Sequence, residues 1–141
     1  MNLFLDSSAL LKIYLNEKGS EEAEKWVGKA DMIFVSAITH IECASAFQRL
    51  FYTKYIDKKQ YQDLNQEISF DFPFFKIVDL GEEVEFVALK ILEQYQMRSL
   101  DAIQLASLLF AGDEVQSFLV CDQKLKKYAI KEGIHVIDPT I

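Results

Sequence analysis

Short, mainly apolar segments alternate along the chain with longer segments that have the periodicity of amphipathic helices. The apolar segments are "NLFLD", "MIFVS", "FKIVDL", "SFLVCD" and "HVID". Strands that are apolar on both sides have to be covered on both faces, which is typical of parallel sheets. The pattern therefore predicts an α/β fold with three layers, in which helices flank a parallel sheet on both sides.

Helices are expected between these strands, and local signals indicate where several of them begin. Ser7 or Ser8, Ser20 and Ser99 are candidate N-caps, and Asp57 with Gln60 forms a plausible capping box. The expected helices cover residues 9–15, 20–30, 38–55, a segment after Asp57, 84–95, a segment from Ser99 to near Gly112, and 123–132.

Length and composition indicate a globular protein. The chain has 141 residues, of which 50% are hydrophobic and 26% charged, so we expect a single domain over residues 1–141. No apolar run approaches the length of a membrane span, and the N-terminus lacks a basic region followed by an apolar one. We therefore expect a cytoplasmic protein that does not enter a membrane. Cys43 and Cys121 do not make a disulfide framework, and both are expected to be buried small hydrophobic residues.

The net charge of −7 limits how the chain can meet nucleic acid. Broad non-specific binding requires a positive surface, which this composition argues against. An enzyme that approaches phosphate through metal ions is not excluded by the same argument. Two local groups of lysines, residues 54–59 and 124–131, are interpreted as solvated helix faces.

Asp101 is an unusual residue within "RSLDAIQLA", because it shares a helical stripe with Leu105 and Leu108. A carboxylate on a core-facing stripe is costly unless its charge is compensated. One explanation is local: if Ser99 caps the helix, Asp101 lies in the first turn, where free N–H groups and the helix dipole favour an acid.

Three further carboxylates have comparable positions. Glu42 lies on a largely apolar helical stripe in "THIECASAF", while Asp6 and Asp122 follow apolar strands. Asp6 and Asp122 can also be loop or cap residues, and Glu42 can pair with Arg49 or face water. In open parallel sheets, however, sites form beyond the carboxyl ends of the strands. The alternative hypothesis is therefore that the four acids converge.

Four convergent carboxylates would require cations. Two carboxylates 4 Å apart repel by roughly 4 kcal/mol at an effective dielectric constant of 20. Hard oxygen ligands favour Mg²⁺ or Mn²⁺, and such ions stabilise the charge that develops on a phosphoryl group. A metal ion would then be the group that compensates Asp101.

The segments "FLDSSALLKIYL", "HIECASAF", "RSLDAIQLA" and "FLVCDQKL", in this order and spacing, resemble the four acidic motifs of PIN-domain nucleases. More narrowly, they are similar to VapC-type toxins of toxin–antitoxin pairs. The resemblance covers nearly the whole chain. It implies an Mg²⁺- or Mn²⁺-dependent endoribonuclease that a cognate antitoxin holds inactive.

The resemblance also assigns residues. It implies that Asp6, Glu42, Asp101 and Asp122 are the catalytic and metal-binding acids, and that Ser7 or Ser8 is the supporting hydroxyl after the first acid. Family members often have Thr or Ser two positions before the last acid, where this chain has Val120. If that hydroxyl orients water or phosphate, activity here is weaker or depends on another contact.

Other functions are open to the same residues. A phosphoacceptor signalling domain also gathers acids around Mg²⁺, although "FLDSS" has one acid only and "KIVDLGEE" is a poor acceptor loop. A catalytically silent binding module of the same fold is a second alternative. A mixed zinc site with His40 is disfavoured, because Cys121 should face away from Asp122 on a strand.

An aromatic-rich helical hairpin favours association, and we expect a homodimer or larger assembly, or an antitoxin helix that covers it. Its aromatic residues are Phe47, Phe51, Tyr52, Tyr55, Tyr61, Phe70, Phe72, Phe74 and Phe75.

Overall fold

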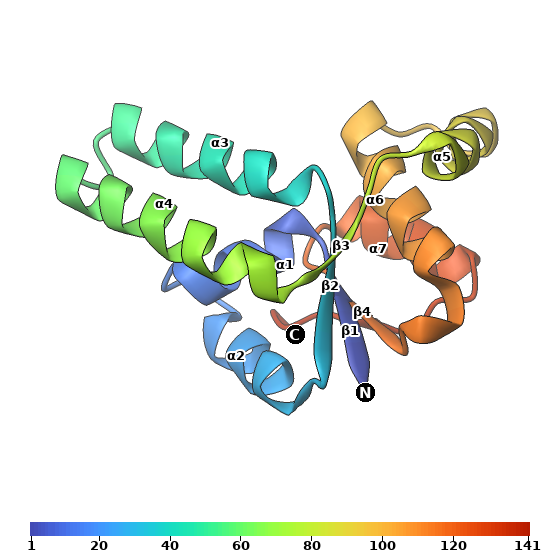
Figure 1. Ribbon diagram of the computed structural model, residues 1–141, viewed down its shortest axis with the longest axis horizontal. Helices are drawn as coiled ribbons and strands as arrows, with labels where there is room; N and C mark the ends of the chain where they lie inside the picture. The colour runs from blue at the N-terminus through green and yellow to red at the C-terminus, as the bar shows by residue number, and fades with distance from the viewer.

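A computed structural model, which describes residues 1–141, has a five-stranded parallel sheet between two layers of helices (Figure 1). The strands lie in the order β3-β2-β1-β4-β5. The predicted fold class is confirmed. The strands are β1 (Asn2–Leu5), β2 (Met32–Ser36), β3 (Lys76–Val78), β4 (Ser117–Leu119) and β5 (Val136–Ile137).

Alternation along the strands divides the core into two halves. Leu3 and Leu5 of β1 pack under one helical layer, and Phe4 packs under the other. The first layer contains α1 (Ser7–Tyr14), α2 (Ser20–Lys29), α3 (Thr39–Tyr52) and α4 (Lys58–Asp71). The second contains α5 (Glu82–Gln94), α6 (Ser99–Ala111) and α7 (Gln123–Lys131). Figure 1 shows these layers on opposite sides of the sheet.

Three of the predicted N-caps are wrong. Asp6 caps α1 by accepting a hydrogen bond from Ala9 N–H, so Ser7 is already the first helical residue. Gly19, with φ of 92°, precedes α2, and Ser20 instead donates to the carbonyl of Leu15. Arg98 precedes α6 and gives no side-chain cap, so Ser99 lies inside that helix. At the β1–α1 junction, the residue that follows the strand takes the capping position.

Other local predictions are confirmed. Asp57 and Gln60 form the capping box of α4, with each side chain bound to the other residue's backbone N–H. Gly133 has φ of 80° and lies just after α7, where the left-handed conformation favours glycine. Both cysteines are free thiols; Cys43 is buried as predicted, whereas Cys121 is only half-buried. No helix is long and apolar enough to cross a bilayer.

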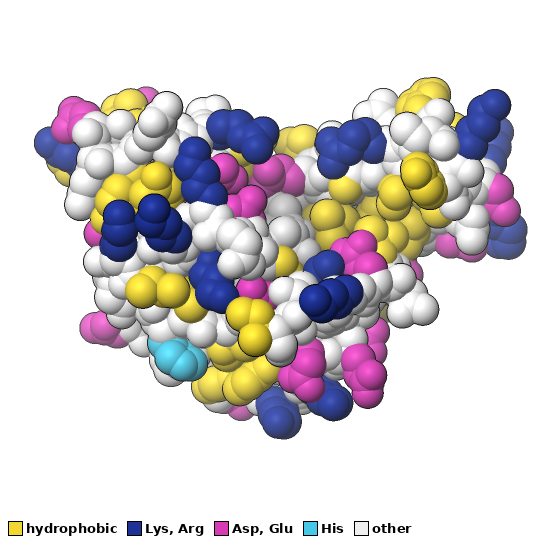
Figure 2. Space-filling view, turned by 180° about the vertical axis from the view of Figure 1, so that it is seen from behind, with side chains coloured by type: hydrophobic (Ala, Val, Ile, Leu, Met, Phe, Trp, Pro, Cys, Tyr) yellow, Lys and Arg dark blue, Asp and Glu magenta, His cyan; other side chains and the backbone are white.

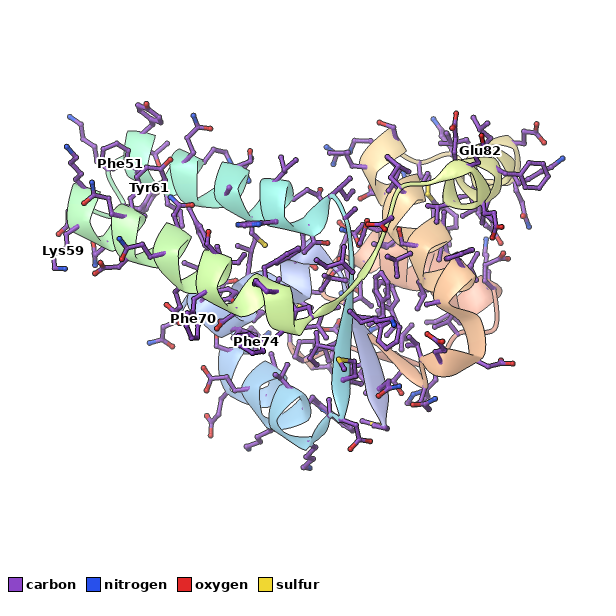
Figure 3. All side chains as sticks on the ribbon, in the orientation of Figure 1. Phe51, Lys59, Tyr61, Phe70, Phe74 and Glu82 are labelled. Atoms are coloured by element: carbon purple, nitrogen blue, oxygen red, sulfur yellow. The ribbon has the colours of Figure 1, made fainter.

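The aromatic residues of the α3–α4 hairpin divide into two groups. Phe47 and Phe72 are buried, and Phe51 stacks on Tyr61 with ring centroids 4.9 Å apart near the outer end of the hairpin (Figure 3). Phe70 and Phe74 are 73% and 72% exposed and lie beside each other near α2. Part of the aromatic set therefore holds the hairpin together, and the rest is open to solvent.

Candidate active site

The carboxyl ends of the parallel strands meet at one edge of the sheet, and the predicted acids lie along it. Asp6 directly follows β1, and Asp122 follows β4 by three residues and caps α7 through Leu125 N–H. Glu42 lies on α3, which comes after β2, and Asp101 lies in the first turn of α6. These placements follow from the sheet order, since β1 lies between β2 and β4.

Asp6 is the most constrained of the four acids. Its side chain is 4% exposed and accepts hydrogen bonds from Ala9 N–H at 2.9 Å and from the Ser8 hydroxyl at 2.8 Å to each oxygen. Burial is the main reason why the pKa of Asp6 rises to about 7. The two hydrogen bonds oppose this rise, while the charges of Asp122 and Glu42 add to it.

The two candidate serines have different contacts. Ser8 bridges two strand ends, because its hydroxyl binds Asp6 and also accepts Cys121 N–H at 3.3 Å. Ser7 donates to Glu42 Oε1 at 2.6 Å. Each serine therefore orients one of the acids, which agrees with a supporting position, and their role in activity stays a prediction.

Glu42 does not pair with Arg49. Its Oε1 atom accepts hydrogen bonds from the Ser7 hydroxyl and from Gln104 Nε2, at 2.6 and 2.8 Å. Its Oε2 atom has no hydrogen-bond donor within the protein. The carboxylate is thus held by one oxygen, and the other is available to a ligand.

Asp101 accepts no hydrogen bond from its helix, although it lies in the first turn as expected. Its pKa is raised, first by burial and then by the charge of Asp122, with a smaller contribution from Glu42. The cations of Arg98 and Lys124 act in the opposite direction. The local explanation for Asp101 therefore has no hydrogen bond to support it, and the neighbouring acids oppose its ionisation.

Glu42 and Asp122 each lie within electrostatic reach of both Asp6 and Asp101. Asp6 is affected by Asp122 and Glu42, and Asp101 is affected by the same two acids. On the face in Figure 2, Asp and Glu side chains gather in a hollow at the upper edge, with Lys and Arg side chains beside it. An acidic site with a cationic rim is the form expected of a site that receives phosphate.

The donor chemistry suits a hard divalent cation, although no three Asp, Glu, His or Cys side chains lie close enough together in this structure to hold a metal ion. Asp101 has both oxygens free of protein donors, and Glu42 and Asp122 have one each. An open arrangement of this kind is compatible with Mg²⁺, which retains several waters and binds through few carboxylates. The residues therefore fit such an ion in the chemistry of their donor atoms.

Sequence reasoning missed Gln104 and Thr39. The Gln104 amide donates to Glu42, to Ser7 and to the Thr39 hydroxyl, which lies 3.0 Å away. For Gln104, the available signal was the one that identified Asp101, namely a polar residue in the apolar pattern of α6. Val120 is fully buried in the core under α5–α7, and what the absence of a hydroxyl there does to activity stays a prediction.

Comparison with known proteins places the chain in a family. The PIN domain family matches residues 3–131, and the chain belongs to this family. No curated protein matches the sequence.

Solved structures show the same fold at low identity. A toxin–antitoxin complex from Klebsiella pneumoniae is 15% identical, with a TM-score of 0.70 and 97% of each chain covered. FitAcB from Neisseria gonorrhoeae is 16% identical, with a TM-score of 0.74 and 97% of each chain covered. VapC20 from Mycobacterium tuberculosis, a sarcin–ricin loop cleaving toxin, is 13% identical, with a TM-score of 0.68, 89% of this chain and 94% of that chain covered.

Proposed function

We propose that the protein is a divalent-metal-dependent endoribonuclease and the toxin of a toxin–antitoxin pair. The observation that carries the proposal is the gathering of four carboxylates at the carboxyl edge of the sheet, one of them almost fully buried. Acids in such mutual reach resist joint ionisation at neutral pH, and a cation relieves that repulsion. Membership of the PIN domain family and a fold shared with an RNA-cleaving toxin support this choice.

The chain's own residues have separate tasks in this proposal. The ligands of the cation are carboxylate oxygens of the four acids, Asp6, Glu42, Asp101 and Asp122. Ser8 orients Asp6, and Ser7 orients Glu42. Arg98 and Lys124 reduce the repulsion between the acids and an approaching phosphate backbone. A bound Mg²⁺ or Mn²⁺ ion supplies charge stabilisation at the phosphoryl group and lowers the pKa of the attacking water.

Removal of metal is expected to stop the reaction. A mixed RNA pool should be cut in Mg²⁺ or Mn²⁺ and left intact in EDTA, because none of the four acids forms a salt bridge with a Lys or Arg side chain of the protein. Gel analysis of the pool with wild type and with Asp122→Asn, purified in parallel, separates this activity from a contaminating nuclease. Undiminished cleavage in EDTA by wild type alone would overturn the metal requirement.

Acid-labile phosphate on the protein after exposure to a phosphodonor, without RNA cleavage, would favour the phosphoacceptor alternative.

The proposed antitoxin has a suitable surface on the first helical layer. A groove of about 290 Å³ runs between α1, α2 and the end of α4, and eight of its nine lining residues are apolar, including Leu10, Val27 and Phe74. Phe70 lies beside Phe74 in the tilted aromatic pair. An amphipathic partner segment would bury these exposed rings, and a toxin–antitoxin complex is among the solved structures of the same fold.

The same exposed rings predict self-association when no partner is present. The isolated protein is expected to be a dimer or larger, since two neighbouring phenylalanines more than 70% exposed favour burial against another surface. Light scattering at high micromolar concentration measures this directly. The double variant Phe70→Ser/Phe74→Ser should shift the mass toward a monomer, with Phe86→Ser, exposed on α5, as the matched control. A monomeric wild type, or an assembly dispersed only by the control, would contradict the prediction.

A further inference from the structure

Gln104 is a buried amide in the middle of an apolar helix. It lies one turn after Asp101 on α6 and is 2% exposed, with Leu105, Ala106 and Leu108 buried around it. A polar side chain in such a place is costly unless its hydrogen bonds are made. The contacts of this amide therefore indicate why the position is polar.

The Gln104 Nε2 group joins three segments of the chain. It donates to Glu42 Oε1 at 2.8 Å, to the Ser7 hydroxyl at 3.0 Å and to the Thr39 hydroxyl at 3.0 Å. Ser7 in turn donates to the same Glu42 oxygen. Helix α6 is thereby linked to the start of α1 and to α3 through one acidic side chain.

The orientation of the amide is determined by Glu42. The Gln104 Oε1 atom is buried and has no donor in the protein, which is energetically costly. Exchange of the amide N and O would place a carbonyl oxygen 2.8 Å from the carboxylate of Glu42, where two acceptors repel. The unpartnered oxygen is thus the consequence of keeping the NH₂ group on Glu42, and such local costs are typical of functional sites.

We infer that Gln104 is a positioning residue that fixes Glu42 so that its Oε2 atom is presented to the divalent cation. This inference rests on the proposed function, because it assigns a role to Gln104 only if Glu42 is a ligand. Residues that hold a ligand in this way typically change metal affinity by about 10- to 100-fold when they are replaced. Gln104 itself does not contact the reacting atoms.

The test is a double-mutant cycle on Mn²⁺ affinity, measured by titration calorimetry of the metal-free protein without RNA. Gln104→Met keeps the length and burial of the side chain but removes the amide, and should weaken Mn²⁺ binding about 10-fold or more. Glu42→Gln should weaken it as well. The combined variant should bind no more weakly than Glu42→Gln alone, because Gln104 acts through Glu42.

Ser107→Ala is the matched control, since it removes another buried polar group of α6, whose hydroxyl binds Ser36 and Ile103 and does not touch Glu42. Its Mn²⁺ affinity should equal that of wild type. Thermal melts in EDTA show that each variant is folded. If Gln104→Met fails to fold, Thr39→Val is the alternative variant. It leaves Gln104 in place but removes the hydroxyl that accepts a hydrogen bond from its amide, and should weaken Mn²⁺ binding by a smaller factor.

The outcomes separate this inference from the proposed function. If wild type binds Mn²⁺ and cuts RNA while Gln104→Met and Thr39→Val bind as tightly, only the role of Gln104 is overturned. Additive losses in the double variant overturn it too, because Gln104 would then act independently of Glu42. A wild type that binds no Mn²⁺ overturns the proposed function, and the positioning role with it.

Discussion

Replacement of Asp101 by Asn is expected to abolish RNA cleavage and to raise the stability of the metal-free protein at neutral pH. The first effect follows if Asp101 is one of the metal-binding acids. The second follows from electrostatics, because burial and the charge of Asp122 raise the pKa of Asp101, so that its ionisation disfavours the folded state. Loss of the helix-terminus interaction, typically about 0.3–1 kcal/mol, acts in the opposite direction.

The measurement combines thermal melts of wild type and Asp101→Asn, in EDTA and in Mn²⁺, with RNA cleavage by the same preparations. The variant should melt higher than wild type in EDTA and gain less from Mn²⁺, because a ligand that binds only the folded state stabilises it more when it binds more tightly. Asp63→Asn, which removes an exposed acid that pairs with Lys59 on α4, is the control. A variant that melts lower in EDTA, keeps the full Mn²⁺ shift and still cuts RNA would leave Asp101 a structural residue of its helix.

Much of the fold could be predicted because burial leaves a strong pattern. Strands apolar on both sides predicted a parallel sheet, and the strand-end rule then placed Asp6 and Asp122 at one edge. The edge strand β3 was harder to delimit. The predicted strand "FKIVDL" was longer than the three residues that pair with β2. Lys76 and Ile77 are exposed there, so burial does not mark the ends of this strand.

The contacts of the site could not be predicted from periodicity. Gln104 and Glu42 are 62 residues apart, and Ser7 is 97 residues from Gln104, so only the folded chain brings them together. The prediction of the N-cap of α1 was wrong for a related reason. Propensity favours Ser at a helix start, but at the β1–α1 junction the strand end places Asp6, not Ser7, where Ala9 N–H can be reached. Whether the four acids act in catalysis stays a prediction that the variants above decide.

The second large effect expected is on pH-dependent stability, and it belongs to Asp6. The pKa of its carboxyl rises from 3.8 to about 7 on folding, chiefly through burial. Between these two values the folded state retains a proton that the unfolded state has lost. The free energy of unfolding therefore falls as the pH rises through this range, by roughly 4 kcal/mol for a pKa shift of this size. Above about pH 7 it levels off.

Asp6→Asn isolates this contribution, because Asn caps a helix about as well as Asp but does not ionise. In EDTA, denaturant unfolding should show similar stability for the two proteins near pH 4 and a clear advantage for Asp6→Asn at pH 8. Asp57→Asn, at the exposed cap of α4, controls for exchange of the capping residue.

Mn²⁺ should reduce the stability advantage of Asp6→Asn at pH 8, because a cation beside Asp6 stabilises its ionised form in the wild type only. If wild type and Asp6→Asn respond to pH identically in EDTA, Asp6 is not the buried, charge-crowded acid described above. If they differ in EDTA but Mn²⁺ leaves the difference unchanged, Asp6 is buried without being a metal ligand.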